Sequence, residues 1–377
     1  MFSEIVLDEN FAIAPPEAPV QFDQPQLTVS DVEVDSLIRV NRARDTFKVN
    51  GSGLAVAVLD TGLRTTHVDF AGKVVAQQNF TTDNGNNPND ASDGQGHGTN
   101  VGGIIVANDL HTGIAPSANI VPLKVLQNVG GGSFATIDSA LQWVLTNHAN
   151  FGISVVNMSL SWTDNNVDDL PFSNLPTTRL IAELKARNVA VVVAAGNYYG
   201  KYRSQGMGFP AILRDVVSVG AVYDSNIGGP LTYFPNTTAL TTSRDQITPF
   251  SQRLHPALNP ATCTDIFAPG APITSSGIQN DRGESIQSGT SQASPVTAGV
   301  ILLMQDFFKK NTGQLPDVDL IINCLKMGSV AITDGDDEND NVPHTNRQFP
   351  RIDALLALEA VRRSLQLELL TTGAAFH

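Results

Sequence analysis

The chain has 377 residues, of which 41% are hydrophobic and 16% charged, and its formal net charge is −14. This composition is typical of a globular protein and argues against disorder throughout. The acidic excess, with no stripe of Lys or Arg to oppose it, argues against nucleic acid and membranes as partners. No window reaches the roughly 18 to 20 apolar residues of a membrane span, and the N-terminus shows no signal-peptide pattern.

The chain divides by composition into a short arm and one large domain. Prolines at positions 15, 16, 19 and 25 stand among acidic and small residues without helical or alternating periodicity, which predicts an extended arm over residues 1–34. From residue 54 onward, aliphatic runs alternate with amphipathic stretches of helical length. This pattern is typical of an α/β fold with an open, mainly parallel sheet and helices on both faces. We therefore predict a single domain over residues 35–377.

The predicted elements follow in chain order. Strands are expected at 54–59, 120–125, 154–158, 189–194 and 216–219, and helices at 97–107, 136–147 and 178–187. Residues 224–262 are rich in Thr, Pro, Asn and Gly and are predicted to be irregular, with a turn at 227–230. A buried helix is predicted over 293–308, followed by an acidic loop at 334–340 and a final helix at about 352–367.

The two cysteines, Cys263 and Cys324, are too few for a disulfide framework and lack the spacing of a zinc site. One bridge between distant segments and two buried free thiols both fit the sequence.

Two motifs present groups suited to proton transfer. Asp60 ends the apolar run Val56–Leu59 and precedes Gly62, so it falls at the carboxyl end of a strand, where active groups of parallel sheets gather. Taken alone, it is equally well a cap or turn residue. His97 is flanked by two glycines and opens an apolar helix, which suits a general base that must approach a substrate.

Two further motifs present a nucleophile and an amide donor. Ser291 begins the long buried helix, where free N–H groups favour a developing oxyanion, although a serine there also serves as a helix cap. Asn197 ends the run Val192–Gly196, and its side-chain amide is either a turn feature or an oxyanion-hole donor.

Together these motifs resemble the subtilisin-like family of serine peptidases. The strings VAVLDTG, GHGTNVGG, AAGN and SGTSQASP occur in the family's order of Asp, His and Ser, and the likeness runs from about residue 35 to residue 362. The resemblance implies a serine endopeptidase with Ser291 as nucleophile, His97 as general base and Asp60 as its orienting partner. It implies Asn197 as the oxyanion donor and no cofactor for the chemistry.

The resemblance also implies where a protein or peptide substrate binds. An extended substrate is expected between two segments, Gly130, Gly131 and Gly132 on one side and Ser159, Leu160 and Ser161 on the other. The primary pocket is expected to have Gly208 at its floor, Met207 beside it and Gly196 and Ser161 as walls, with no charged side chain among them. This predicts a preference for Leu, Phe, Met or Tyr before the scissile bond, with Phe134 lining an apolar site three residues further upstream.

The chain departs from the family's pattern at several positions. Asn100 and Gly102 stand where a second His and an Ala are more usual, and Gln292 and Ser294 replace Met and Ala after the nucleophile. Trp162 follows Ser161 where small glycines are usual, so its bulk is a competing determinant that would favour smaller residues in the pocket.

Calcium is expected only as a structural ion. The loop between Ala107 and Gly113 is too short for the family's strong calcium site, whereas Asp334, Asp336 and Asp340 offer clustered oxygen ligands. A solvated acidic loop explains the same residues.

Family habits leave further expectations open. An inhibitory propeptide of domain size does not fit before Asp60, so residues 1–34 are expected to begin a mature chain or to form an arm that packs on the domain or covers the cleft. Secretion is the commoner habit of the family, but intracellular members exist and are typically acidic. Two rival functions on this scaffold are a peptide ligase or macrocyclase, which needs a lid that is not evident here, and a catalytically silent binding protein, against which the intact motifs argue.

Overall fold

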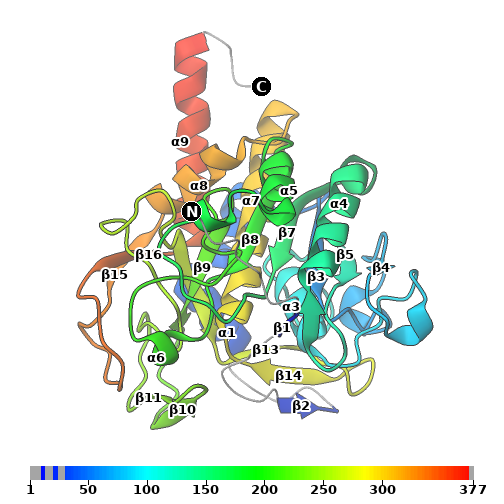
Figure 1. Ribbon diagram of the computed structural model, residues 1–377. Helices are drawn as coiled ribbons and strands as arrows, with labels where there is room; N and C mark the ends of the chain where they lie inside the picture. The colour runs from blue at the N-terminus through cyan, green and yellow to red at the C-terminus, as the bar shows by residue number, and fades with distance from the viewer. Residues whose placement is uncertain (1–9, 13–19, 24–29, 373–377) are drawn as a thin grey trace.

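The computed structural model describes residues 10–12, 20–23 and 30–372 of the chain, and a large central sheet organises them (Figure 1). In spatial order its nine strands are β15 (Val330–Thr333), β16 (Gln348–Arg351), β12 (Ile266–Ala271), β9 (Val217–Tyr223), β8 (Ala190–Ala194), β7 (Ile153–Met158), β3 (Ala55–Asp60), β5 (Asn119–Lys124) and β4 (Gln78–Asn79). All neighbours are parallel except β15 and β16. The predicted open, mainly parallel sheet is therefore confirmed.

Helices cover both faces of this sheet. They are α1 (Ser30–Ile38), α2 (Val40–Phe47), α3 (His97–Val106), α4 (Phe134–Phe151), α5 (Pro176–Lys185), α6 (Tyr199–Tyr202), α7 (Thr290–Thr312), α8 (Val318–Met327) and α9 (Ala354–Thr372). Alternate residues of β3 point to opposite faces: Val56 and Val58 pack with α3 and α7, whereas Ala57 and Leu59 pack with α4 and α5. Two apolar cores result, one on each side of the sheet.

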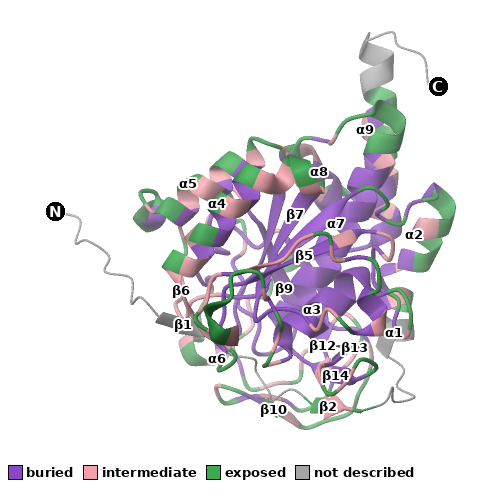
Figure 2. Ribbon diagram, turned by 90° about the vertical axis from the view of Figure 1, so that its right-hand side faces the viewer, coloured by how far each residue is buried: buried purple, intermediate pink, exposed green. Residues whose placement is uncertain are grey.

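Helix α7 forms the centre of the first core. Eighteen of its residues are buried, and Figure 2 shows it enclosed, whereas the outer faces of α4 and α5 are exposed. The predicted buried helix at 293–308 is confirmed, but it starts three residues earlier and ends four residues later. None of the helices in the described part of the chain combines the length and apolar character needed to cross a membrane.

Local signals explain most differences from the predicted boundaries. Helix α4 begins at Phe134 because Ser133 caps it through a reciprocal capping box with Thr136. The segment 224–262 is not wholly irregular, since β10 (Leu231–Tyr233) and β11 (Thr237–Ala239) form a hairpin whose turn follows Tyr233. Both cysteines are buried and free, which decides between the two alternatives.

The predicted arm contributes two short strands where it is described. Strand β1 (Asn10–Ala12) pairs antiparallel with β6 (Gly131–Ser133), and β2 (Val20–Phe22) pairs with β14 (Glu284–Gln287), which itself pairs with β13 (Ile273–Ser276). Strands β2, β13 and β14 lie together below the sheet in Figure 1. Residues 1–9, 13–19 and 24–29 of the arm lie outside the described residues, and residues 30–34 belong to α1.

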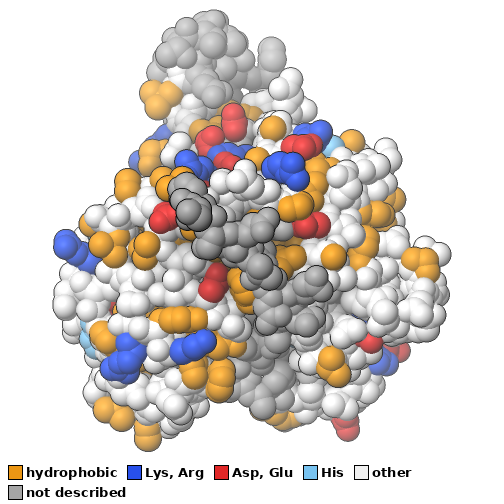
Figure 3. All heavy atoms as spheres, viewed as in Figure 1, with side chains coloured by type: hydrophobic (Ala, Val, Ile, Leu, Met, Phe, Trp, Pro, Cys, Tyr) orange, Lys and Arg blue, Asp and Glu red, His pale blue; other side chains and the backbone are white. Residues whose placement is uncertain are grey.

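The surface of the described residues carries no large block of one charge on the face shown in Figure 3. Lys and Arg side chains stand there in small separate groups among acidic, apolar and uncharged side chains. Because charges of both signs are interspersed, this face does not present a field of one sign, although the net charge of the chain is negative.

A buried polar network joins the loop after β3 to β13 and β14. Asp69 accepts hydrogen bonds from His111 Nδ1 (2.8 Å) and Ser276 Oγ (2.6 Å) and from the backbone N–H groups of residues 110 and 111. His111 Nε2 lies 3.4 Å from Glu284. Burial alone would raise the pKa of Asp69, but the hydrogen bonds from His111 and Ser276 outweigh it and lower that pKa to about 2.

Asp69 should therefore stabilise the fold above pH 4 and lose this effect in acid. As the pH falls from 4 towards 2, the unfolded chain takes up the proton before the folded chain does, so about 2 kcal/mol of unfolding free energy should be lost. Replacing Asp69 with Asn should flatten this part of the stability curve, measured by denaturant unfolding at each pH. The exposed Asp109→Asn variant is the control, and an unchanged slope in Asp69→Asn would contradict the assignment.

Candidate active site

The carboxyl ends of β3, β7 and β8 meet the start of α7 at one edge of the sheet. Asp60 is the last residue of β3, and His97 is the first residue of α3. Both side chains are fully buried, and His97 Nδ1 lies 2.8 Å from Asp60 Oδ1. The carboxylate thus fixes the ring and its tautomer, with Nδ1 donating and Nε2 left as the basic nitrogen.

The start of α3 is shaped to bring His97 onto Asp60. Asp93 caps this helix through bonds from the N–H groups of Gly96 (2.8 Å) and Thr99 (2.9 Å). Gly98 donates its N–H to Thr61 Oγ1 at 2.9 Å, and a Cβ at this position would overlap the carbonyl of Gly62. The glycine after His97 is therefore required for the helix to approach the Asp60 turn.

Ser291 is tied to the end of β7 by two reciprocal bonds. Its hydroxyl donates to the carbonyl of Ser159 at 3.1 Å, and the Ser159 hydroxyl donates to the carbonyl of Ser291 at 2.6 Å. The second bond is available because Pro295, four residues on in α7, has no N–H to donate to that carbonyl. The Ser291 hydroxyl is thus directed to Ser159.

Asn197 follows β8 and is held by the residue before Ser291. Its Oδ1 accepts from the backbone N–H and the Oγ1 of Thr290, both at 2.9 Å. These two bonds orient the amide with its NH₂ group turned away from Thr290. Asn197 and Ser291 are thereby placed side by side at the same helix start.

The residues expected at the primary pocket lie together. Gly208 donates to the carbonyl of Ala195 at 3.0 Å, and a Cβ at Gly208 would lie 3.1 Å from Ser161 Cβ. Gly196 has a φ of +112°, and a Cβ there would overlap the amide of Gln252 and approach Ser161. Met207 is fully buried, and its sulfur accepts a bond from Thr264, so its side chain belongs to the core beside the pocket.

An acidic residue that the sequence motifs did not include, Asp164, lies next to Gly208. Asp164 Oδ1 would be 3.4 Å from a Cβ at Gly208, and it accepts the N–H of Phe209 at 2.9 Å. Its other oxygen accepts from Asn166, and burial raises the pKa of the Asp164 carboxyl. The motifs did not reveal it because no pattern in the sequence links position 164 to position 208.

Trp162 packs against the residue expected to line the upstream site. Its ring meets Phe134 edge-on with centroids 5.8 Å apart, and the ring centroids of Phe134 and Phe209 are 5.3 Å apart. Phe134 directly follows β6, and the other expected substrate segment consists of Gly130 and the first two residues of β6, Gly131 and Gly132.

The arm occupies an edge of that segment. On one side of β6, Gly132 bridges to Leu126, and on the other Asn10, Phe11 and Ala12 pair with Ser133, Gly132 and Gly131. The second arm strand, β2, pairs with β14, which leads into the Ser291 turn.

Two departures from the family pattern contact each other. Gln292 Nε2 donates to Asn100 Oδ1 at 3.3 Å, and Asn100 Nδ2 donates to the carbonyl of Ser285 at 3.0 Å. Ser294, a third departure, donates to Asn157 Oδ1 at 2.8 Å. Gln292 and Ser294 thus stand where Met and Ala are more usual, and each makes a hydrogen bond that lowers the cost of its burial. Gln292 Oε1, however, is buried without a partner among the described residues.

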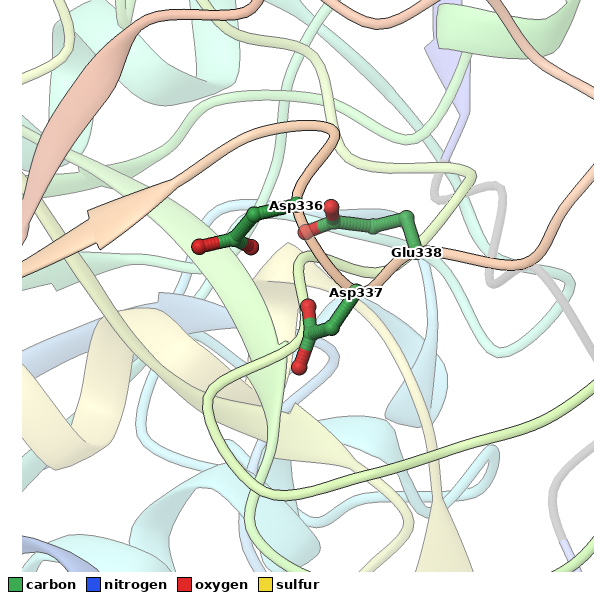
Figure 4. A group of neighbouring side chains, drawn as sticks. All are labelled: Asp336, Asp337 and Glu338. Atoms are coloured by element: carbon green, nitrogen blue, oxygen red, sulfur yellow. The ribbon is translucent and has the colours of Figure 1, made fainter.

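The acidic loop gathers a set that overlaps the expected one only at Asp336. Carboxylate oxygens of Asp336, Asp337 and Glu338 lie within 4.8 Å of one another on one turn of the chain (Figure 4). Asp334 is instead fully buried in a two-pronged ion pair with Arg253, and Asp340 accepts from His344 at 3.0 Å. Burial is the largest cause of raised pKa values at Asp337 and Glu338, and nearby acidic groups add to it. The donor set is one of hard oxygen ligands, which suits calcium.

Comparison with known proteins assigns the family. Residues 51–325 match the model of the Subtilase family. The chain is 30% identical over 268 residues to the Major intracellular serine protease of Bacillus subtilis, covering 69% of this chain and 70% of the relative. It is 31% identical over 288 residues to Alkaline serine exoprotease A of Vibrio alginolyticus, covering 76% of this chain and 44% of the relative. It is 34% identical over 179 residues to Subtilisin DY of Bacillus licheniformis, covering 47% of this chain and 58% of the relative.

The fold and the comparisons agree with the resemblance in the motifs. The chain belongs to the subtilase family and is a subtilisin-like serine protease. The chain spans about half the length of Alkaline serine exoprotease A and of Subtilisin DY.

Several residues that shape the site were not found from the sequence. Thr290 orients Asn197, and Asp93 caps α3. Gln252 donates its backbone N–H to the carbonyl of Gly196 at 2.8 Å and its side-chain amide to the carbonyl of Asp164 at 2.9 Å. Thr290 lies inside the SGTS string and was within reach of motif reasoning, whereas Gln252 carries no local signal.

Proposed function

We propose that the protein is an endopeptidase in which Ser291 attacks the scissile carbonyl, His97 takes the proton and Asp60 orients His97. The observation that carries this proposal is the buried 2.8 Å bond between Asp60 and His97 Nδ1, which leaves Nε2 as the base. His97 then protonates the leaving amine, and water hydrolyses the acyl-enzyme by the same route. Asn197 and the N–H of Ser291 are the proposed oxyanion donors.

The triad is tested by non-additivity. Ser291→Ala and His97→Ala should each lower kcat by about 10⁴- to 10⁶-fold, and the double variant should be little worse, because the residues act as a unit. Ser294→Ala, one turn further along the same helix, is the matched control and should keep most of the activity. Losses that multiply in the double variant would contradict the assignment, and ligated rather than hydrolysed products would favour a peptide ligase.

The primary pocket is proposed to prefer large apolar residues. Its walls are glycine, serine and buried apolar side chains, so burial of apolar area should contribute about 25 cal/mol per Å². The Asp164 carboxylate already accepts bonds from Phe209 and Asn166, and we assign it to holding the floor.

A peptide library tests this preference. Cleavage should occur mainly after Leu, Phe, Met or Tyr, and Asp164→Asn should leave this order unchanged. Cleavage after Lys or Arg that disappears in Asp164→Asn would show that Asp164 selects basic residues, and cleavage after Ala alone would implicate Trp162.

The arm is proposed to compete with substrate. An extended peptide that pairs with β6 needs the edge that Asn10–Ala12 occupies, so it must displace β1. Deleting residues 1–12 should therefore lower KM for a long peptide by roughly 3- to 10-fold with kcat little changed, because an attached competitor acts at a high effective concentration. Deleting only residues 1–9 keeps β1 and should leave KM unchanged. Equal KM values in both deletions would show that the arm does not compete with substrate.

Calcium is proposed as a structural ion held by Asp336, Asp337 and Glu338. Binding should relieve the mutual repulsion of these carboxylates and raise the Tm, and chelator should reverse the gain. Asp336→Asn with Asp337→Asn should abolish the response, with Asp109→Asn as control. If neither calcium nor chelator changes the Tm, these residues form a solvated surface and do not bind the ion.

A further inference from the structure

A lysine side chain is completely buried behind the Asp60 turn. Lys124 is the last residue of β5, its relative exposure is 0%, and its partner in the sheet register is Asp60. Because directly paired residues of neighbouring strands point to the same face, its side chain runs beside that of Asp60. The proposed mechanism assigns this cation no role.

The Lys124 ammonium joins three segments of the site. It donates to the carbonyl of Thr61, the residue after Asp60, and to Asn128 Oδ1 at 2.9 Å. It lies 3.5 Å from Asp83 Oδ2, which accepts the N–H of Asn128 at 2.6 Å. Asn128 Oδ1 also accepts the N–H of Gly94, in the loop that delivers His97, at 3.1 Å.

Burying this charge is costly, and the surrounding acids offset part of the cost. Burial is the largest influence on the pKa of Lys124 and lowers it, whereas the charges of Asp93, Asp83 and Asp60 act in the opposite direction. An apolar residue of similar length would avoid the desolvation penalty. Stability alone would therefore favour an apolar side chain over a charged one at this position.

We propose that Lys124 is a positioning residue for catalysis: its ammonium fixes the Asp60–Thr61 turn and the Asn128 loop before β6, and through Asn128 it holds the Gly94 loop that delivers His97. This proposal rests on the proposed roles of Asp60 and His97. Asp60, the register partner of Lys124, is one of the acids whose charge acts on the ammonium. Asp83 and Asp93 are the other charged groups that act on Lys124 from neighbouring segments, and each weakens the field of the cation.

The split between kcat and KM gives a direct test. Lys124→Met removes the donor shared by the Thr61 carbonyl and Asn128, so kcat should fall by about 10-fold or more with KM changed by less than about 2-fold, because the turn that carries Asp60 loses its anchor. Lys124→Arg keeps a cationic donor and should restore most of kcat.

A second buried lysine provides the matched control. Lys73 is 7% exposed, donates to the carbonyls of Pro116 and Ala118, and has its pKa lowered by burial, but it belongs to the loop after β3 rather than to the site. Lys73→Met should lower the Tm without lowering kcat. A loss of kcat in Lys73→Met as large as in Lys124→Met, or an unchanged kcat in folded Lys124→Met, would overturn the proposal.

A second variant keeps the test decisive if Lys124→Met does not fold. Asn128→Ala removes the acceptor shared by the Lys124 ammonium and the N–H of Gly94, so kcat should fall by about 3-fold or more. An unchanged kcat in folded Asn128→Ala would overturn the role of Lys124. A failure of the proposed function shows separately, as activity retained in Ser291→Ala.

Discussion

The parallel register of β3, β7 and β8 is the constraint on which the site depends. Val58 pairs with Asn157, and Met158 pairs with Val193, so the chain leaves all three strands at the same edge of the sheet. Backbone hydrogen bonding and two buried cores fix this register, because a slip of one residue would turn each apolar side chain to the wrong face. Asp60, Ser159 and Asn197 are thus brought together by the core and not by any attraction among themselves.

The start of α7 is fitted to that edge by a small number of polar contacts. Pro295 removes one helical hydrogen bond, and Ser159 supplies the missing donor to the Ser291 carbonyl. Thr290 holds Asn197 through two bonds to one oxygen. A helix start with unpaired N–H groups is normally satisfied by caps or water, and here its surroundings are side chains suited to acyl transfer.

The sequence was sufficient for the fold class. It also named the four side chains that the proposed mechanism uses, since each lies in a short string with its own strand end or helix start. It was insufficient where a contact joins distant positions without a local pattern. Asp164 beneath Gly208 and Gln252 beside Gly196 are of this kind, and so is the pairing of β1 with β6. Strand β12 was missed because Pro269 and Gly270 interrupt its apolar run, although its neighbours on both sides determine its place.

Two buried polar atoms at the site lack hydrogen-bond partners among the described residues. Among the described residues, His97 Nε2 and Asp60 Oδ2 lie in buried positions with no hydrogen-bond partner, while the Ser291 hydroxyl bonds elsewhere. Leaving such atoms unpaired costs the folded protein stability, typically about 1–3 kcal/mol each. An acyl-transfer step that takes the Ser291 proton onto Nε2 recovers the bond missing there, so an arrangement unfavourable for the resting protein favours the reacting complex. The apolar cores on both faces of the sheet are what allow the fold to carry this cost.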